Sequence, residues 1–449
     1  MEDLKIRRKL RLNSYQIILL GFALTILVGS GLLLLPFASK GESASFGDAL
    51  FTATSAVCVT GLVVRDTASS WSGFGQAVII ILIQIGGVGI ITVVAWIARF
   101  TGYKIGLLQR STLQEAISAH KVGSILRLSL FVLKATLVVE FVGAVLLFPV
   151  MNAQFGFLKG VWYSVFHSIS AFCNAGFDLM GVKEPYSSVC SFVGNPLLNL
   201  TIMLLIITGG LGFVTWNDIR AHKFRFRKYG LQSKIIIVCT LVLIFVPAVY
   251  FFFAEFSSER WKELTVGEKI LASLFQSVTT RTAGFNSVDL TKLAETSLLL
   301  MIILMLIGAS PGSTAGGMKT TTVAIIFATL FSVLKRRGDT RVFGRRIADS
   351  TIKVAVSVFL MYISLFTLGG FVISAAEGLP LLSCMFETAS AIGTVGLSLG
   401  ITPSLGVLSK IILILLMFFG RVGGLTIMFA VIAQKPDTGA KLPEEKISV

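Results

Sequence analysis

Long apolar segments alternate with shorter, mixed segments along the 449 residues of the chain. Each apolar segment has about 20 residues or more, the length that an α-helix needs to span a bilayer. The apolar segments lie at residues 14–36, 74–99, 127–150, 196–217, 235–256, 297–335, 352–375 and 406–433. We therefore predict eight membrane-spanning helices.

A mixed segment that is rich in Ser and Thr and ends at a glycine lies between the two members of each pair of predicted spans. Such a segment, for example residues 48–60 or 163–175, is too short to cross the bilayer, which indicates a re-entrant helix followed by a loop. Non-helical backbone at membrane depth is tolerated only where protein or a water-filled cavity covers it. We therefore expect the four loops to face inward, toward one another.

The four mixed segments resemble one another in sequence. They read FTATSAVCVTGL, FHSISAFCNAGF, FQSVTTRTAGF and FETASAIGTVGL, and their glycines are Gly61, Gly176, Gly284 and Gly396. Spacings of 115, 108 and 112 residues between these glycines divide the chain into four near-equal repeats. One such segment alone would be a tight turn with a packing glycine, whereas four in register favour a ring around one axis.

The repeats are predicted at residues 14–110, 111–225, 226–340 and 341–433, between an N-terminal segment, 1–13, and a C-terminal tail, 434–449. Each contains an outer helix, a re-entrant pore helix with a filter loop, and an inner helix. Because the number of spans per repeat is even, successive repeats are parallel, whereas inverted repeats need an odd number. The predicted fold class is an all-α integral membrane protein with four pseudo-symmetric repeats around one central pore.

Composition agrees with a membrane protein, since 54% of the residues are hydrophobic, 14% are charged and the mean hydropathy is +0.85. The first apolar run lacks a small-residue cleavage site, which favours a span over a removable signal.

The termini and the segments that join the repeats hold 26 Lys and Arg against 9 Asp and Glu, and the opposite loops hold 10 Lys and Arg against 13 Asp and Glu. This bias predicts a multi-pass protein of the cell membrane with both termini in the cytoplasm. Nucleic-acid binding is a poor alternative, because the basic residues are scattered over five segments.

The residues at and just before the four glycines carry no carboxylate. They are Val59, Thr60 and Gly61; Asn174, Ala175 and Gly176; Thr282, Ala283 and Gly284; and Thr394, Val395 and Gly396. A ring of charged side chains is thus excluded at these positions, and backbone carbonyl oxygens are left to replace the hydration shell of a monovalent cation. Glycine suits this role because it lets the backbone approach the axis closely. Such a ring favours K⁺ as the transported ion, and the spacing alone leaves Na⁺ open.

The order of outer helix, pore helix, filter glycine and inner helix resembles the Trk/Ktr/HKT superfamily of K⁺ transporters over nearly the whole chain. Glycine in all four filter positions is similar to the K⁺-selective members, whereas related plant proteins with Ser in the first filter favour Na⁺. Since the chain opens directly on its first repeat, we expect it to be most similar to a bacterial Ktr membrane subunit.

The resemblance implies partners as well. They are a second copy of the chain, giving a homodimer with one pore per subunit, and a cytoplasmic ring of nucleotide-binding regulatory subunits of the RCK/KTN type on the basic face. Na⁺ as an activating ion stays open.

The inner segment of the third repeat is predicted to be broken. Its apolar residues 298–307 lead into GASPGSTAGGMKTTT at residues 308–322, where a proline and several glycines oppose an α-helix. We predict an intramembrane loop that blocks or admits ions, which is also what the resemblance implies; the alternative is a kinked helix with a polar packing surface. The predicted gate residues are Gly308, Pro311, Gly312, Thr314, Gly316, Gly317, Lys319 and Arg421.

Arg421 lies within a predicted span, in FFGRVGGL. A guanidinium at this depth is costly and usually has both a partner and a function. Below the filter its charge would raise the barrier to a cation, and the resemblance implies that it lies next to the loop; the alternative is an arginine bonded to carbonyl groups for structure alone. Lys319 is predicted to anchor the loop on its cytoplasmic side.

Other motifs predict structure rather than chemistry. GGVG at residues 86–89 and GGLG at residues 209–212 are expected to allow close helix packing. Cys58 and Cys173 are too few for a soft-metal site, and five cysteines do not suggest a disulfide framework. His167 and Glu387 are expected to form local hydrogen bonds, and His120 and His222 to lie on the surface.

No motif for a covalent cofactor, a metal cluster or catalysis is present in the sequence. We therefore predict no enzyme and no catalytic residue, but K⁺ uptake driven by the membrane potential, which is worth about 2.3 kcal/mol per charge per 100 mV. One competing hypothesis is an alternating-access symporter that couples K⁺ to Na⁺ or H⁺. Another is a membrane scaffold that transports nothing.

Overall fold

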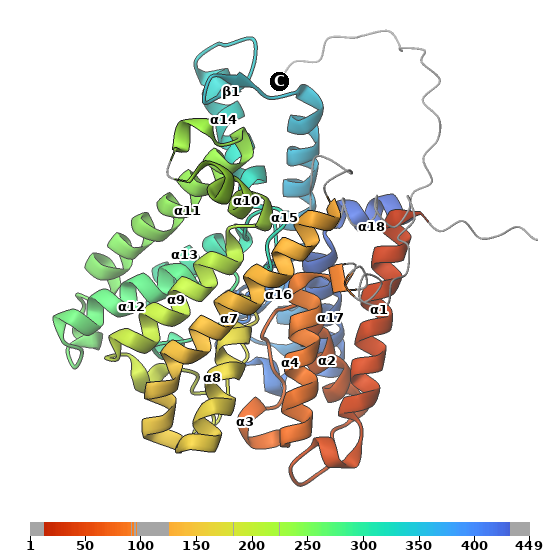
Figure 1. Cartoon of the computed structure of the whole chain (residues 1–449), viewed down its shortest axis with the longest axis vertical. Coiled ribbons are helices and arrows are strands. Elements are labelled where there is room, and N and C mark those ends of the chain that lie inside the picture. The colour runs from red at the N-terminus through yellow and green to blue at the C-terminus, as the bar shows by residue number, and fades with distance from the viewer. Residues whose placement is uncertain are drawn as a thin grey trace, which may run out of the picture.

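The computed structural model describes residues 13–90, 92–93, 96, 125–182, 184–223 and 225–431. The ends 1–12 and 432–449, the junction of the first two predicted repeats and His120 fall outside these residues. The described part is a bundle of helices, from which one end of α14, a small hairpin and the start of α15 rise (Figure 1). The hairpin pairs strand β1 (Arg341–Val342) antiparallel with β2 (Arg345–Arg346).

The helices divide among four quarters of the chain. The first quarter has α1 (Ser14–Leu33), η1 (Pro36–Ala38), α2 (Phe46–Val57), α3 (Thr67–Ser70) and α4 (Gly73–Val88). The second has α7 (Ile125–Phe155), α8 (Phe157–Phe172), η3 (Cys190–Phe192), α9 (Pro196–Gly210) and α10 (Phe213–His222). The third has η4 (Phe226–Lys228), α11 (Leu231–Tyr250), the π-helical η5 (Phe251–Glu255), η6 (Glu259–Trp261), α12 (Val266–Thr279), η7 (Leu290–Lys292), α13 (Glu295–Leu306) and α14 (Thr320–Leu334). The fourth has α15 (Asp349–Glu377), α16 (Leu381–Gly393), η8 (Thr402–Ser404), α17 (Val407–Val422) and α18 (Gly424–Val431).

Local sequence fixes many of the helix starts. Asn13 and Gln16 form a capping box at the start of α1, and Thr265 and Glu268 form another at the start of α12. Ser45 accepts a hydrogen bond from the third residue of α2, which satisfies one of its free N–H groups.

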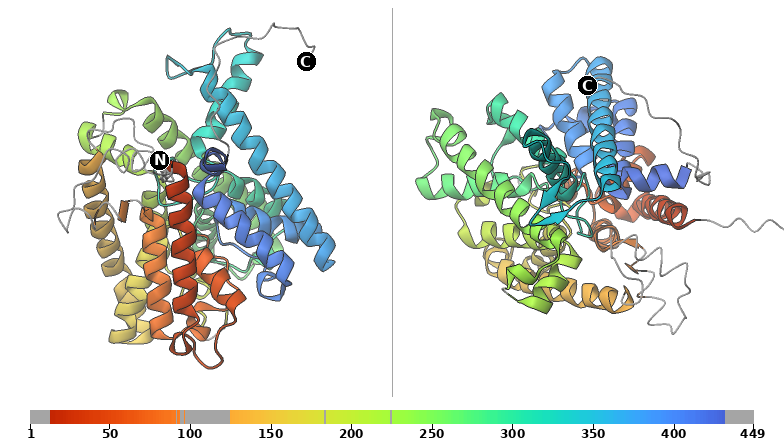
Figure 2. Two further views of the ribbon diagram at one scale, coloured as in Figure 1. Left: turned by 90° about the vertical axis from the view of Figure 1, so that its right-hand side faces the viewer. Right: turned by 90° about the horizontal axis from the view of Figure 1, so that it is seen from above.

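Seen from above, the quarters follow one another around the molecule in chain order (Figure 2).

Four helical segments of the described residues are long and apolar enough to cross a membrane: Ser14–Leu33, Leu128–Phe155, Leu231–Glu255 and Asp349–Glu377. The bent pair α9 and α10 makes a fifth if it is counted as one span. The remaining apolar helices are shorter.

Three predicted inner helices are interrupted where the sequence suggested one continuous span. Helix α4 ends before Gly89, α9 and α10 are separated at Gly212 with a 95° bend, and α17 ends before Gly423. These glycines have φ values of 93°, 85° and 89°, which a right-handed helix cannot contain. The prediction of uninterrupted helices over 74–99, 196–217 and 406–433 was therefore wrong. The third inner segment is interrupted as well, between α13 and α14.

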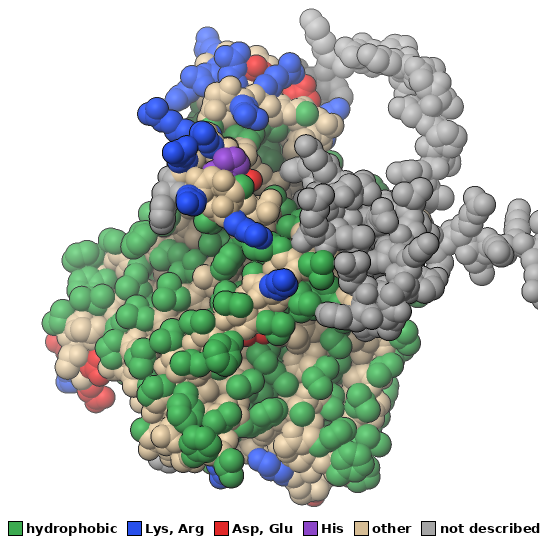
Figure 3. All heavy atoms as spheres, in the orientation of Figure 1, with side chains coloured by type: hydrophobic (Ala, Val, Ile, Leu, Met, Phe, Trp, Pro, Cys, Tyr) green, Lys and Arg blue, Asp and Glu red, His purple; other side chains and the backbone are tan. Residues whose placement is uncertain are grey.

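Apolar side chains cover the outside of the bundle, and many polar side chains lie inside it. Phe141 and Phe253 are each 70% exposed, whereas Ser and Thr residues of α2, α8, α12 and α16 are buried. Figure 3 shows a broad band of hydrophobic side chains, with Lys and Arg gathered at the end that carries the hairpin. This distribution suits a protein that is surrounded by lipid and encloses a polar interior.

Candidate ion pathway

Helices α2, α8, α12 and α16 lead into the four glycine segments. Glycines of the neighbouring apolar helices allow them to pack closely: a Cβ atom on Gly86, Gly209 or Gly420 would collide with the carbonyl oxygen of Val57, Phe172 or Ile392, respectively. Each of these carbonyl groups lies at or near the C-terminal end of one of the four helices. The close packing predicted for GGVG and GGLG is thus confirmed at Gly86 and Gly209.

The four glycine loops, residues 59–61, 174–176, 282–284 and 394–396, meet at one place. A Cβ atom added to any of the four glycines would lie 2.9–3.3 Å from the Cα atom of the next glycine. These contacts run from Gly61 to Gly176, to Gly284, to Gly396 and back to Gly61. Segments more than 100 residues apart in the sequence therefore form a closed ring of backbone.

All four glycine loops share an unusual backbone conformation. The residue two positions before each glycine has a left-handed φ: 57° at Val59, 59° at Asn174, 60° at Thr282 and 51° at Thr394. The glycines themselves have φ between 68° and 93°, whereas the residue between has a negative φ. A left-handed β-branched residue is strained, and such strain is concentrated at functional sites. The alternation of positive and negative φ values lets successive carbonyl groups turn toward the same side of the chain.

A hydroxyl group of the preceding helix holds each glycine loop. Ser55 Oγ accepts a hydrogen bond from the Gly61 N–H at 3.0 Å, and Ser390 Oγ accepts one from the Gly396 N–H at 2.9 Å. In the other two quarters Ser170 and Thr279 donate to the carbonyl oxygen of the residue after the glycine, at 2.6 and 2.7 Å. Sequence reasoning missed these residues, although a Ser or Thr five or six positions before each glycine was a usable signal.

Three threonines of the glycine loops have buried hydroxyl groups that form no hydrogen bond within the described residues. They are Thr60, Thr282 and Thr394. A buried hydroxyl group without a hydrogen bond is costly unless water or an ion contacts it. These oxygens are therefore free to contact a cation or its water.

A cavity of about 520 Å³ lies on one side of the ring and is lined by all four glycines. Four carboxylates also line this outer cavity, and its described lining contains no Lys or Arg. The carboxylates are those of Asp66, Asp178, Glu184 and Asp289. Burial, together with the nearby carboxylate of Asp66, raises the pKa of Asp178, in the loop between α8 and α9, to about 7. The outer cavity therefore attracts cations.

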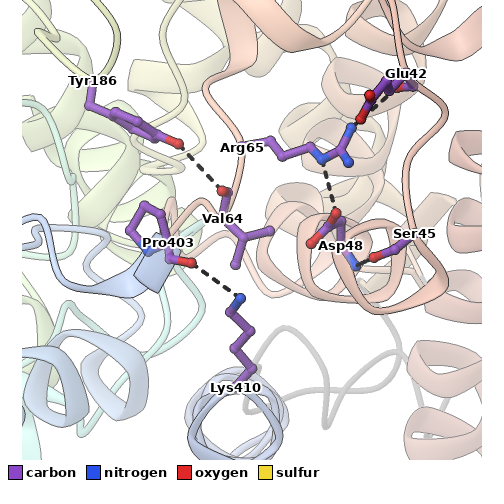
Figure 4. Close-up of polar contacts among 8 residues, drawn as sticks. All are labelled: Glu42, Ser45, Asp48, Val64, Arg65, Tyr186, Pro403 and Lys410. Carbon is purple, nitrogen blue, oxygen red and sulfur yellow. Dashed lines mark hydrogen bonds and ion pairs between the residues drawn. The ribbon is translucent and has the colours of Figure 1, made fainter. Parts of the chain in front are cut away.

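Polar contacts tie the outer loops together (Figure 4). The Tyr186 hydroxyl donates to the carbonyl oxygen of Val64 at 3.3 Å, and Lys410 donates to that of Pro403 at 3.2 Å. Arg65 forms an ion pair with Asp48, with Nε and Oδ2 2.9 Å apart. Because Arg65 is paired, its charge does little to offset the carboxylates of the outer cavity.

The segment between α13 and α14, residues 307–319, packs against the other side of the ring, and we call it the crossing loop. Its Thr314 hydroxyl donates to the carbonyl oxygen of Phe172 at 3.0 Å and lies 3.1 Å from Oδ1 of Asn174. A Cβ atom on Gly316 would lie 2.9 Å from Cγ2 of Thr394. The crossing loop thus contacts the second and fourth glycine loops.

Backbone hydrogen bonds fasten the crossing loop to two other quarters. Its Gly312 carbonyl oxygen accepts from the Phe213 N–H at 2.8 Å, and its Gly317 N–H donates to the Gly420 carbonyl oxygen at 3.1 Å. Lys319 Nζ donates back to the carbonyl oxygens of Ala315 and Gly316, at 3.1 and 3.4 Å. Of the other predicted gate residues, Gly308 packs against the backbone of 316–318 and Pro311 against Gly212.

Arg421 joins the crossing loop to the first quarter. Its guanidinium donates to the carbonyl oxygen of Thr314 in the loop and to those of Gly86 and Gly87 in α4. Neither of the two interpretations made from the sequence is removed by this geometry, because carbonyl contacts can serve a barrier as well as a structural role.

A second cavity, of about 450 Å³, lies beyond the crossing loop. Its lining includes Lys319, Arg421 and Tyr362 together with apolar side chains of α1, α15 and α18. The described lining of this inner cavity contains no carboxylate. The two cavities on either side of the ring and loop therefore carry charges of opposite sign.

The remaining residues singled out in the sequence lie away from this path or support it. His167 contacts the Tyr163 carbonyl oxygen at 2.7 Å, and Glu387 accepts from Thr402 at 2.6 Å and from Ser398 at 2.7 Å, so the local hydrogen bonds predicted for both are confirmed. Cys58 and Cys173 are buried free thiols, and the described residues hold no cluster of His, Cys, Asp and Glu suited to a metal ion.

Arg281, which the sequence reasoning missed, lies within the third glycine segment. It is only 4% exposed, and its Nη2 donates to the Thr240 hydroxyl at 3.1 Å. Its carbonyl oxygen accepts from the Asn174 side chain at 3.4 Å, which links the second and third glycine loops.

A helical fold with an apolar exterior, a polar interior and two cavities of opposite charge is typical of a protein that moves ions across a membrane. The chain matches the TrkH family model, described as cation transport protein, over residues 12–439. It therefore belongs to the TrkH family, and the resemblance to the Trk/Ktr/HKT superfamily is confirmed.

Relatives match the chain over its full length. It is 39% identical to the potassium/sodium uptake protein NtpJ of Enterococcus hirae, covering 100% of this chain and 99% of the relative. It is 38% identical to the Ktr system potassium uptake protein B of Bacillus subtilis, covering 99% and 98%. The crystal structure of the potassium transporter TrkH from Vibrio parahaemolyticus has the same fold, with a TM-score of 0.71 and 20% identity over 95% of this chain and 86% of that one.

Proposed function

We propose that this chain is the ion-translocating subunit of a K⁺ uptake system. One observation carries the proposal: four glycine loops from distant parts of the chain meet in a closed ring of backbone. The relative from Enterococcus hirae is named as a potassium/sodium uptake protein and the one from Bacillus subtilis as a potassium uptake protein. Both names include potassium, which supports K⁺ as the transported ion.

The glycine loops act as the selectivity filter. K⁺ collects in the carboxylate-lined outer cavity, sheds its water at the ring and is held there by carbonyl oxygens of residues 59–61, 174–176, 282–284 and 394–396. The free hydroxyl groups of Thr60, Thr282 and Thr394 supply further oxygens. The C-terminal ends of α2, α8, α12 and α16, where helix dipoles are negative, lie next to the loops and favour a cation as well.

The crossing loop and Arg421 act as the gate. Contacts with Phe172, Gly420 and the guanidinium of Arg421 hold the loop against the ring. Arg421 places a positive charge near the path of a cation, which raises the barrier to its passage. The proposed gate residues are Gly308, Pro311, Gly312, Thr314, Gly316, Gly317, Lys319 and Arg421.

The same arrangement supports a proposed membrane topology. We assign eight spans in four pseudo-symmetric repeats, 14–110, 111–225, 226–340 and 341–433, with both termini in the cytoplasm. The gathering of Lys and Arg at the hairpin end supports this orientation (Figure 3). The outer cavity then opens away from the cytoplasm.

The assembly is a homodimer in the cell membrane, regulated by a cytoplasmic ring of nucleotide-binding subunits that docks on the basic face. The word "system" in the names of the Ktr relatives supports a partner subunit. The hairpin between α14 and α15, with Arg341, Arg345 and Arg346, is part of that face.

A second candidate is a symporter that couples K⁺ to Na⁺ or H⁺, or a transporter that Na⁺ activates. One observation favours it: the carboxyl group of Glu140 in α7 is buried and accepts a hydrogen bond from Gln84 at 3.3 Å, close to Cys173 and the second glycine loop. Intramembrane carboxyl groups are typical of ion-coupled transport. Uptake that requires a Na⁺ or H⁺ gradient, and loses this requirement in Glu140→Gln, would favour the symporter.

The proposed function is tested by ⁸⁶Rb⁺ uptake into vesicles that contain the purified full chain. We expect Gly61→Ser and Gly284→Ser to reduce the preference for K⁺ over Na⁺, because each serine would collide with a carbonyl group of the next loop. The matched control is Gly41→Ser: Gly41 also has a positive φ, 82°, but has nothing within 4 Å of an added Cβ atom. Unchanged selectivity in both ring variants would refute the filter assignment.

A further inference from the structure

The described lining of the inner cavity contains two cationic side chains and no carboxylate. The two are Lys319 and Arg421. Their hydrogen bonds go to backbone carbonyl oxygens, which carry only partial charge. Two partly buried charges without a counter-charge are costly, and an anion in the cavity would offset that cost.

Both side chains have donors left for a ligand. Lys319 Nζ has three protons, of which the structure assigns two to the carbonyl oxygens of Ala315 and Gly316. Arg421 uses Nη1 and Nη2 for carbonyl groups, and its Nε takes part in no hydrogen bond within the described residues. Lys and Arg are the side chains that bind phosphate groups best.

The rest of the inner cavity suits an amphiphile. Its lining includes Ile18 and Phe22 of α1, Val354 and Val358 of α15, and Phe429 of α18. These side chains surround a volume of about 450 Å³, which exceeds the space that a phosphate group needs. The outer faces of α1 and α15 carry exposed apolar residues such as Leu24 and Leu360, as expected of helices in contact with lipid.

We propose that the inner cavity is a regulatory site for a phosphate-type anion, which binds Lys319 and Arg421 and promotes opening of the gate. This inference rests on the proposed function, because it assigns a regulator to the proposed gate. The anion is either the headgroup of an anionic phospholipid or free phosphate, which share the chemistry of a phosphate oxygen facing Lys and Arg. The apolar lining makes the lipid the better fit.

Two physical effects connect anion binding to opening. A negative charge beside Lys319 and Arg421 lowers the positive potential that a cation meets below the ring. Phosphate oxygens also compete with the Thr314 carbonyl group for the donors of Arg421, which weakens the attachment of the crossing loop to α17. Both effects act in the same direction, so ion flux rises when the site is filled.

The test uses the full chain in vesicles of phosphatidylcholine alone, of phosphatidylcholine with phosphatidylglycerol, and of phosphatidylcholine loaded with inorganic phosphate. We expect at least a threefold rise in ⁸⁶Rb⁺ flux with phosphatidylglycerol, and its loss in Lys319→Gln. Native mass spectrometry measures retained phosphatidylglycerol independently of flux. Lys335→Gln, a change of an exposed lysine outside the cavity, is the matched control and should respond like the parent chain.

The outcomes test the anion site and the proposed function separately. A rise in ⁸⁶Rb⁺ flux with inorganic phosphate but not with phosphatidylglycerol would assign the site to the free anion. Equal flux in all three vesicle types, or a rise that Lys319→Gln retains, would overturn the anion site and leave the proposed function intact. Absence of flux under every condition would refute the proposed function, and lipid retention that depends on Lys319 would then still decide whether the anion site exists.

Discussion

The ring of glycines makes a sharp prediction for Gly176→Ala. A Cβ atom at this position would lie 2.8 Å from the Ala283 carbonyl oxygen and 2.9 Å from the Cα atom of Gly284. The carbonyl oxygen is thus about 0.6 Å closer than the 3.4 Å of ordinary van der Waals contact, and it must retreat by about that distance. Gly176 also has a φ of 68°, which costs alanine about 1–2 kcal/mol.

These two effects can be separated with Gly378→Ala. Gly378 ends α15 with a φ of 66°, close to that of Gly176, but an added Cβ atom there meets nothing within 4 Å. Both variants therefore place alanine at a similar positive φ, and only Gly176→Ala displaces a carbonyl group of the ring. We expect Gly378→Ala to lose some thermal stability and to keep parental transport, and Gly176→Ala to lose more stability and to change transport.

The size of the transport effect follows from the contact that is disturbed. A polar contact with a charged group contributes about 1.5–3 kcal/mol net, and 1.4 kcal/mol corresponds to tenfold in affinity. Loss of one carbonyl contact with the ion should lower K⁺ affinity by roughly 10- to 150-fold. The assay is ⁸⁶Rb⁺ uptake into vesicles in competition with K⁺ and Na⁺. The reasoning is refuted if Gly176→Ala keeps the parental affinity and preference, or if Gly378→Ala loses as much.

Four further predictions concern other parts of the molecule. Arg421→Ala should raise ⁸⁶Rb⁺ flux roughly fivefold to tenfold, the effect of about 1–1.4 kcal/mol off the barrier; reduced flux in a folded variant would contradict a barrier role. Ser55→Ala removes the acceptor of the Gly61 N–H and should cost about 1–3 kcal/mol of unfolding free energy, measurable by thermal denaturation in detergent. Asp178 has a raised pKa of about 7, so it loses its charge as the external pH falls from 8 to 6. Uptake at low K⁺ should then drop about threefold, which is the effect of one charge about 6 Å away in a water-like dielectric. Asp178→Asn should abolish this pH dependence. Hydrogen bonds from the N–H and hydroxyl groups of Thr265 lower the pKa of Glu268. The contribution of Glu268 to stability is therefore present above pH 4.5 and is lost as the pH falls. The difference in melting temperature between the parent and Glu268→Gln should vanish in acid.

The elements around the ring could be predicted because the sequence repeats itself there. The same arrangement of Phe, Ser or Thr and a terminal glycine recurs four times, and the structure brings those four glycines into contact. The polarity of α2, α8, α12 and α16 was equally readable, since buried Ser and Thr in an otherwise apolar chain indicate an enclosed polar interior.

The breaks at Gly89, Gly212 and Gly423 could not be predicted from hydropathy. An apolar pattern records which side chains avoid water and is silent about the sign of φ, so a glycine that bends a helix and one that lets helices pack look alike. GGVG and GGLG contain both kinds: Gly86 and Gly209 pack against carbonyl groups, whereas Gly89 and Gly212 end helices.

The partners of Arg421 were hidden for a related reason. Its hydrogen bonds go to backbone carbonyl groups of Thr314, Gly86 and Gly87, and a carbonyl group is present in every residue. No pattern of side chains therefore marks the contact, in contrast to an ion pair with Asp or Glu. The buried Arg281 was missed because it lies inside a segment read only for its glycine.

A ring built from one polypeptide differs from a ring of four identical subunits in what it can evolve. Any change to an identical subunit appears in all four quarters of the ring. A loop that packs against one side of such a ring would therefore have to be present four times or not at all. In the described part of this chain, the third quarter has a loop between α13 and α14 that contacts two of the other glycine loops, and the fourth quarter supplies the arginine that binds this loop. A single chain can therefore carry one such loop on one side of the ring, while the four glycine loops keep a common plan.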